Sequence, residues 1–264
     1  MSGPPATPTP TPIPVFDDNY VWAVHDGRQA LVVDPGQAGP VAHWLQTHGL
    51  ALAAILITHH HDDHIGGLAA LRRRWPQALA WGPADERIAD LNHVVGEGDT
   101  VQVAAPALAF QVLAVPGHTR SHLAFHGHGL LFSGDTLFSA GCGRLFEGTP
   151  AQMLASLQRL AALPGDTLVC CGHEYTLGNC RFALAVEPGN ATLQDHARQV
   201  RQWREQDRPS LPSRIDLERA INPFLRVEQP AIGQWLAAHA GLANDADPVA
   251  AFAALRAAKD SFRG

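Results

Sequence analysis

A short run of metal-capable side chains lies between an apolar stretch and a glycine pair, and it constrains the fold more than any other feature. The run 58–64 (Thr-His-His-His-Asp-Asp-His) directly follows the apolar stretch 53–57, which is predicted to be a buried strand. Imidazole and carboxylate ligands of this kind suit zinc, iron or manganese. Because one small ion cannot use four such groups well, the spacing predicts two adjacent ions sharing one loop. The pattern H-x-H-x-D-H comprises His59, His61, Asp63 and His64.

The direction of each side chain in this run follows from the backbone. Side chains alternate along an extended loop, so His59 and His61 should point to one side. His60 and Asp62 should then point away from the metal ions, and His60 is not expected to be a ligand.

Three further candidate ligands follow glycine at the ends of predicted strands: His118, Asp135 and His173. Because the backbone can turn sharply at a glycine, each side chain can be aimed into a common cleft. A lone histidine in such a place is more often structural, but its occurrence together with the run 58–64 favours metal ligation. His122, four residues after His118, is expected either to orient a ligand or simply to pack.

Composition excludes several classes of protein. The chain has 264 residues, of which 46% are hydrophobic, enough for one large domain or two smaller ones. A net charge of −6 argues against a nucleic-acid-binding protein, and no apolar run is long enough to span a membrane. Residues 1–12 are rich in proline and threonine and lack the features of a signal peptide, so they predict a disordered tail. The four cysteines form no C-x-x-C pair, which favours reduced thiols and a cytoplasmic protein.

The order of the expected elements indicates an α/β (α+β) fold. Strands and helices mix up to about residue 174, which predicts sheets covered by helices. Hairpins are expected at Asp26-Gly27 and around 127–129. Beyond residue 174 the strand signal fades, so a smaller helical domain is expected over 175–264. Its predicted helices cover 190–206, 229–240 and 248–259.

The ligand motifs resemble those of the metallo-β-lactamase superfamily. The resemblance implies an αββα sandwich with the metal site at one edge, followed here by the smaller C-terminal helical domain. It implies two ligand sets: His59, His61 and His118 for one ion, and Asp63, His64 and His173 for the other. Asp135 would bridge the two ions together with a hydroxide, and Asp63 and Asp135 would be the catalytic carboxylates.

Other motifs resemble glyoxalase II, the hydroxyacylglutathione hydrolase family. They lie at 14–20, 141–149, 172–176, 187–190, 222–226 and 256–262. The resemblance implies a metallo-β-lactamase domain over 13–174 and a substrate-binding helical domain over 175–264. It implies that six residues contact the substrate: Arg144, Phe146, His173, Tyr175, Arg256 and Lys259.

Two of these positions depart from the family pattern. At two others, the residue types and their spacing themselves indicate binding of a carboxylate. Arg144 stands where lysine is common and keeps the charge. Phe146 stands where tyrosine is common, and the lost hydroxyl could weaken glutathione binding by ~0.5–1.5 kcal/mol. Arg256 and Lys259 are three residues apart on one helix face, where two cations can grip a carboxylate.

The resemblance implies hydrolysis of S-(2-hydroxyacyl)glutathione, chiefly S-D-lactoylglutathione, to glutathione and D-lactate, as in methylglyoxal degradation. Two divalent metal ions are expected, zinc first, with iron or manganese also suited to the ligands. The protein is expected to be a monomer with no nucleic-acid or membrane partner. The alternatives are a glutathione persulfide dioxygenase with a single iron, a β-lactamase or tRNA-processing nuclease, and a non-enzymatic metal-dependent binding protein.

Overall fold

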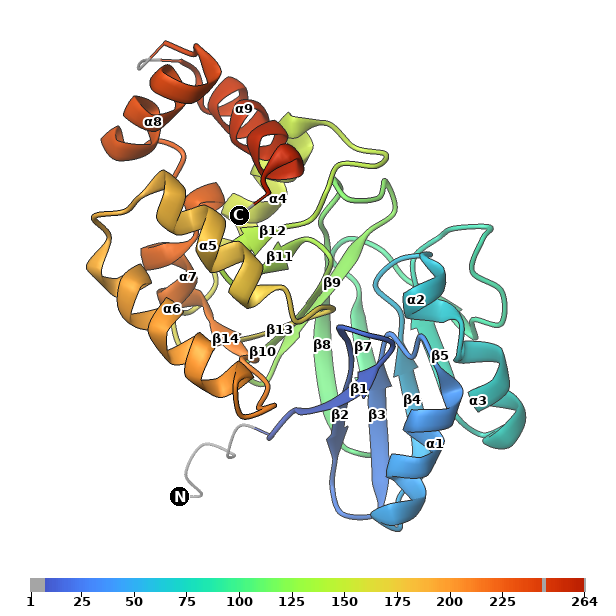
Figure 1. Ribbon diagram of the computed structural model, residues 1–264. Helices are drawn as coiled ribbons and strands as arrows, with labels where there is room; N and C mark the ends of the chain where they lie inside the picture. The colour runs from blue at the N-terminus through green and yellow to red at the C-terminus, as the bar shows by residue number, and fades with distance from the viewer. Residues whose placement is uncertain (1–7, 244–245, 264) are drawn as a thin grey trace, which may run out of the picture. The chain divides into compact units, whose positions relative to one another are not determined.

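The structure is a computed structural model that describes residues 8–243 and 246–263 (Figure 1). The chain divides into two compact units. The first unit comprises the residues up to Ala114 together with Ser121–Gly134, and the second comprises Val115–Arg120 and the residues from Asp135 onward. Each unit therefore contains part of the predicted ligand set, and each is described by itself.

The first unit contains a six-stranded sheet with the order β1-β2-β3-β4-β5-β6. The pairs β1/β2 and β2/β3 are antiparallel, and the pairs from β3 to β6 are parallel. The hairpin predicted at Asp26-Gly27 is confirmed, since it joins β2 to β3. The strands are β1 (Thr11–Val15), β2 (Asn19–His25), β3 (Gln29–Val33), β4 (Ala51–Leu56), β5 (Leu79–Gly82) and β6 (His93–Val94).

Both faces of this sheet are buried. On one face, α1 (Ala38–Thr47) and α3 (Leu68–Arg74) contribute to a hydrophobic cluster that includes Val21 of β2. The next residue, Trp22, points to the other face and is also buried. Burial on both faces is the pattern of a sheet sandwiched between two layers.

The other strands of the first unit form antiparallel neighbours in the order β10-β9-β8-β7. The hairpin predicted around 127–129 is confirmed, and His128 and Gly129 adopt positive φ there. The backbone N–H of Leu123 donates to the carbonyl of Thr58 at 2.9 Å, which joins the start of β9 to the ligand run. The strands are β7 (Thr100–Val103), β8 (Leu108–Ala114), β9 (Leu123–Gly127) and β10 (Leu130–Gly134).

The second unit is mostly helical, as expected beyond residue 175. Its strands form two antiparallel pairs, β11 (Leu137–Phe138) with β12 (Gly141–Cys142), and β13 (Leu168–Cys171) with β14 (Ser213–Arg214). The predicted helices over 190–206, 229–240 and 248–259 are confirmed within a few residues. The helices are α4 (Pro150–Ala161), α5 (Thr176–Val186), α6 (Ala191–Arg204), α7 (Ile215–Ile221), the 3₁₀ turn η1 (Pro223–Leu225), α8 (Pro230–Ala240) and α9 (Pro248–Ser261).

The first strand begins inside the predicted tail. Thr11 and Pro12, which were expected to be disordered, belong to β1, and Ile13 and Val15 after them are buried. Because β1 is an edge strand, it tolerates its prolines, and proline content alone therefore hid the strand. Of the rest of the expected tail, residues 8–10 form no helix or strand, and residues 1–7 lie outside the described residues. Among the described residues, no helix is long and apolar enough to cross a membrane.

Candidate metal centre and substrate site

The first unit carries four candidate ligands on two kinds of backbone. His59 and His61 lie in the loop after β4, whereas Asp63 and His64 lie in the short helix α2 (Asp62–Ile65). The run is therefore not extended throughout, and side chains alternate only as far as His61. His59 Nε2 lies 3.1 Å from His61 Nδ1, and His64 Nε2 lies 3.5 Å from Asp63 Oδ2. These nitrogen and oxygen atoms are close enough to share metal ions.

Asp34, at the end of β3, orients two of these rings. Its carboxylate accepts hydrogen bonds from the backbone N–H and the hydroxyl of Thr58, both at 2.7 Å, and contacts His64 Nδ1 at 3.0 Å. Because the Thr58 hydroxyl gives its proton to Asp34, it accepts from His59 Nδ1 at 3.0 Å. Both Nδ1 atoms are thus engaged, so Nε2 is the atom of each ring that could bind a metal ion.

Neighbouring residues fix the rest of the run. The side-chain amide of Asn19 donates to Asp63 Oδ2 at 2.9 Å. A Cβ at Gly36 would overlap the carbonyl of Asp63, so only glycine allows this close approach. His60 contacts Asp85, with Nδ1 and Oδ2 separated by 3.4 Å, and this carboxylate also binds Arg87.

His122 packs directly on a candidate ligand. Its ring stacks on that of His59, with centroids 4.6 Å apart and an interplanar angle of 19°. His122 is itself buried, and Gly134 allows it room, since a Cβ there would come within 2.8 Å of the His122 ring. Its contact with His59 fits an orienting role.

The second unit brings its three candidate ligands together. The Nε2 atoms of His118 and His173 lie 3.4 and 3.3 Å from Asp135 Oδ2, and all three side chains are buried. His118 Nδ1 donates to the carbonyl of Arg144 at 2.9 Å, which leaves Nε2 for a metal ion. The sharp turns predicted before His118 and Asp135 are present, since Gly117 and Gly134 adopt φ of +154° and +48°.

Aromatic rings surround these ligands within the second unit. The His173 ring stacks on that of Tyr175, with centroids 4.6 Å apart, and also contacts Phe138. The Phe146 ring meets His118 edge-on at 5.2 Å. Phe146 and Tyr175 are 62% and 40% exposed, so each offers an apolar surface beside a candidate ligand.

Three predicted substrate contacts form a cationic cluster in the second unit. Arg256, which is only 5% exposed, donates to the carbonyl of Cys142 at 2.7 Å and to Asp260 Oδ1 at 3.1 Å. Arg144 Nε lies 3.5 Å from the same oxygen. Lys259 Nζ donates to a backbone carbonyl at 3.3 Å. Burial lowers the pKa of Lys259, and the charges of Arg256 and Arg144 lower it further. The three cations were predicted from the sequence, whereas Asp260 was not.

Three residues that position candidate site residues escaped the sequence analysis: Asp34, Asn19 and Asp260. Asp34 had a signal, since it directly follows the apolar run 30–33 and precedes Pro-Gly. Asp260 also had a signal, since it follows Arg256 by four residues on one helix face. Asn19 contacts Asp63, which is far away in the sequence, so spacing alone could not identify that contact.

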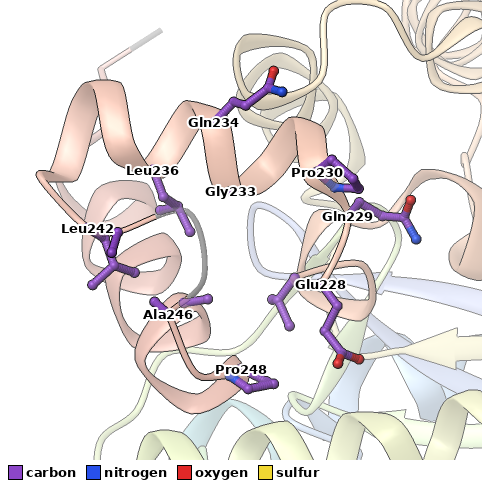
Figure 2. A pocket seen from close by; sticks show the side chains of 12 residues that line it. Glu228, Gln229, Pro230, Gly233, Gln234, Leu236, Leu242, Ala246 and Pro248 are labelled. Atoms are coloured by element: carbon purple, nitrogen blue, oxygen red, sulfur yellow. The ribbon is translucent and has the colours of Figure 1, made fainter.

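A cavity in the second unit lies among α8, α9 and their connections (Figure 2). It has a volume of about 360 Å³ and is lined by residues including Glu228, Gln229, Leu236 and Ala251. None of the predicted site residues lines it, so it carries no part of the candidate site.

Comparison with known proteins identifies the family. The model for the metallo-β-lactamase superfamily matches residues 14–173, and the model for the hydroxyacylglutathione hydrolase C-terminus matches 174–262. A hydroxyacylglutathione hydrolase of Cupriavidus taiwanensis is 54% identical over 263 residues, covering 96% of this chain and 98% of the relative.

Solved structures show the same fold. The crystal structure of BLEG-1 B3 metallo-β-lactamase has a TM-score of 0.64 at 24% identity, covering 82% of this chain and 99% of that one. That of ETHE1 from Myxococcus xanthus has a TM-score of 0.63 at 28% identity, covering 95% of this chain and 98% of that one.

The fold and the ligand motifs thus define a member of the metallo-β-lactamase superfamily, with mixed α/β sheets and a C-terminal helical region. Within that superfamily the chain belongs to the hydroxyacylglutathione hydrolase (glyoxalase II) family. The predicted fold and family are confirmed. Family membership and clustered histidine and aspartate side chains together support binding of divalent metal ions.

Proposed function

We propose that this enzyme hydrolyses S-(2-hydroxyacyl)glutathione, chiefly S-D-lactoylglutathione, to glutathione and D-lactate. The observation that carries the proposal is the gathering of Arg144, Arg256 and Lys259 in the unit that also holds His118, Asp135 and His173. The cations suit a substrate with carboxylates, and the ligands suit a hydrolytic metal centre. The relative from Cupriavidus taiwanensis, which is named as a hydroxyacylglutathione hydrolase, supports this choice over a persulfide dioxygenase.

We propose that the candidate ligands of each unit bind divalent ions, two in all, and that these ions are zinc. The donor set of imidazoles and carboxylates fits such ions, and the Nδ1 contacts of His59, His64 and His118 leave Nε2 of each ring for binding. Bound ions would lower the pKa of a water molecule and polarise the thioester carbonyl. Asp135 would bridge the two ions, and Asn19 would hold one oxygen of Asp63 in place.

The cationic cluster would bind the glycine carboxylate of glutathione. Lys259 and Arg144 are the accessible members, whereas Arg256 is buried and holds the Cys142 carbonyl. Phe146 and Tyr175 would form apolar walls near His118 and His173. Because Phe146 has no hydroxyl, it contributes contact area but no hydrogen bond.

The leaving group needs little help from the protein. A thiolate is stable near neutral pH, so no side chain has to protonate it during bond cleavage. Residues 13–174 would then carry the chemistry and 175–264 most of the glutathione binding. The four cysteines are all free and buried, which agrees with our proposal of a cytoplasmic protein.

The decisive experiment is hydrolysis of S-D-lactoylglutathione by purified protein, with metal content measured on the same sample. We expect release of glutathione and D-lactate that is abolished by a chelator and restored by zinc. Oxygen consumption with glutathione persulfide, without thioester hydrolysis, would instead support the dioxygenase.

A further inference from the structure

A short hairpin links the predicted metal ligands to the predicted glutathione contacts in the second unit. It consists of β11, β12 and the residues between them, Leu137 to Cys142, which we call the linking hairpin. Asp135 stands two residues before it and Arg144 two residues after it. The position of this hairpin therefore affects both parts of the site.

The linking hairpin contacts the metal ligands through its flanking residues. The N–H of Gly143 donates to the carbonyl of Thr136 at 3.2 Å, which closes the hairpin next to Asp135. The carbonyl of Arg144 accepts from His118 Nδ1 at 2.9 Å and so sets the orientation of that ring. A side chain at Gly143 would overlap the Asp135 carbonyl, so the packing here is tight.

Helix side chains hold the other side of the hairpin. The amide nitrogen of Asn222, at the end of α7, donates to the carbonyls of Phe138 and Gly141 at 3.1 and 2.9 Å. Its oxygen accepts from the N–H of Phe224 at 3.1 Å. Asn179 of α5 donates to the carbonyl of Ser139 at 3.0 Å. Both asparagines are buried.

A buried carboxylate completes this arrangement. Glu218 of α7 accepts the N–H of Ala140 at 2.8 Å and the amide of Asn222 at 3.0 Å, and it also binds Ser213. Ala140 adopts a φ of +52°, which is uncommon for a residue with a side chain. The surrounding hydrogen bonds therefore impose this backbone conformation rather than follow from it.

We propose that Asn222 and Asn179 are positioning residues for the metal centre: they fix the linking hairpin so that the Arg144 carbonyl orients His118 for metal binding. The proposal rests on the proposed metal-binding role of His118 and Asp135. It gives the helical region a part in metal binding besides its part in substrate binding. Neither asparagine touches a metal ligand in the hydrogen bonds described above, so the effect is transmitted through the hairpin backbone.

The test uses Asn222→Asp, which keeps the oxygen that caps η1 but replaces the nitrogen that donates to the two hairpin carbonyls and to Glu218 with an acceptor oxygen. Asn190→Asp is the matched control. The oxygen of Asn190 likewise caps a helix, accepting from Leu193 at 3.1 Å, and its nitrogen likewise donates to a backbone carbonyl, that of Ala220, at 2.9 Å. Asn190 has no hydrogen bond to the linking hairpin among those the structure describes.

The measurement is zinc affinity of the metal-depleted full-length proteins, by competition with a chelator, beside their melting temperatures without metal. We expect Asn222→Asp to bind zinc at least ~10-fold more weakly than the wild type, the range seen when residues that orient metal ligands are changed. Asn190→Asp should bind zinc with an affinity within about twofold of the wild type, even if its melting temperature falls as far as that of Asn222→Asp.

A second variant, Asn179→Ala, tests the same hairpin and decides the matter if Asn222→Asp does not fold. Wild-type zinc affinity in Asn179→Ala and in any folded Asn222→Asp would overturn the proposal. An equal loss in Asn190→Asp would also overturn it, because affinity would then follow general stability. A wild-type protein that binds no zinc would instead refute the proposed metal-dependent function.

Discussion

Lys259 offers the cleanest test of how the protein would recognise glutathione. Its ammonium group lies at the surface side of the cationic cluster and donates to the carbonyl of Gly178 at 3.3 Å. Arg256 is less suitable, because its guanidinium is buried, binds the Cys142 carbonyl and lies 5.0 Å from the Phe224 ring centroid. Arg256→Ala would therefore lose stability as well as substrate contact, whereas Lys259→Ala should mainly remove a charge.

The expected size of the effect follows from one charge-assisted hydrogen bond. Such a bond to a substrate carboxylate contributes ~1.5–3 kcal/mol, which corresponds to roughly 10- to 100-fold in kcat/KM. Because Lys259 is half-buried and partly screened, we expect the lower end of this range. The carboxylate lies far from the reacting bond, so the loss should appear chiefly as a raised KM, with kcat changed less.

Steady-state kinetics with two thioesters provides the assay. S-D-lactoylglutathione should lose efficiency with Lys259→Ala, and its analogue with the glycine carboxylate converted to an amide should lose much less. Arg263→Ala is the control for net charge, since Arg263 lies just beyond α9 and contacts the Phe262 carbonyl. An unchanged KM for S-D-lactoylglutathione in Lys259→Ala would refute the carboxylate-binding assignment.

Further predictions concern pH, the metal ligands and the thiols. Because burial and the neighbouring cations lower the pKa of Lys259, its ammonium group loses its proton at a lower pH than an ordinary lysine does. Affinity for a non-hydrolysable S-alkylglutathione should therefore fall as pH rises through that pKa, and calorimetry should show that Lys259→Arg removes this fall. Asp135→Ala should lower bound metal, measured by elemental analysis, and retention of two ions with full activity would disprove the bridge. His59→Ala should lose metal whereas His60→Ala should keep it, and equal losses would mean that the loop is misassigned. Burial raises the pKa of Cys142 to about 11, so thiol reagents should modify it only after unfolding, as mass spectrometry can determine.

The sequence was sufficient where a local pattern determines the structure. The turn at Asp26-Gly27 was predictable because the Asp26 carboxylate accepts the N–H groups of Arg28 and Gln29, and because Gly27 tolerates a φ of +91°. The helix at 150–161 was predictable from its start, where Thr149 and Gln152 form a capping box.

The sequence was insufficient where packing overrides local signals. α5 contains Gly178 and has no side-chain N-cap, so propensity gives it little support, yet it buries Phe182. α7 has only seven residues and follows Pro212 closely. Asp63 and His64 were placed on an extended loop, but the carboxylate and ring are carried by the helix α2. Such short helices depend on tertiary contacts that periodicity does not reveal.

Resemblance to a family motif does not by itself assign a residue to the substrate. The motifs at 187–190 and 222–226 contact each other: Glu187 and Arg226 form two hydrogen bonds, at 2.9 and 3.0 Å. Glu187 is buried in this pair, so its charge is already compensated within the protein. Arg144 and Lys259 are not compensated in this way. Their cluster contains three cations, with Arg256 as the third, but a single carboxylate, that of Asp260. Arg144 and Arg256 contact this carboxylate. An excess of positive charge, rather than motif membership, is therefore the physical ground for our proposal that glutathione binds at Arg144 and Lys259.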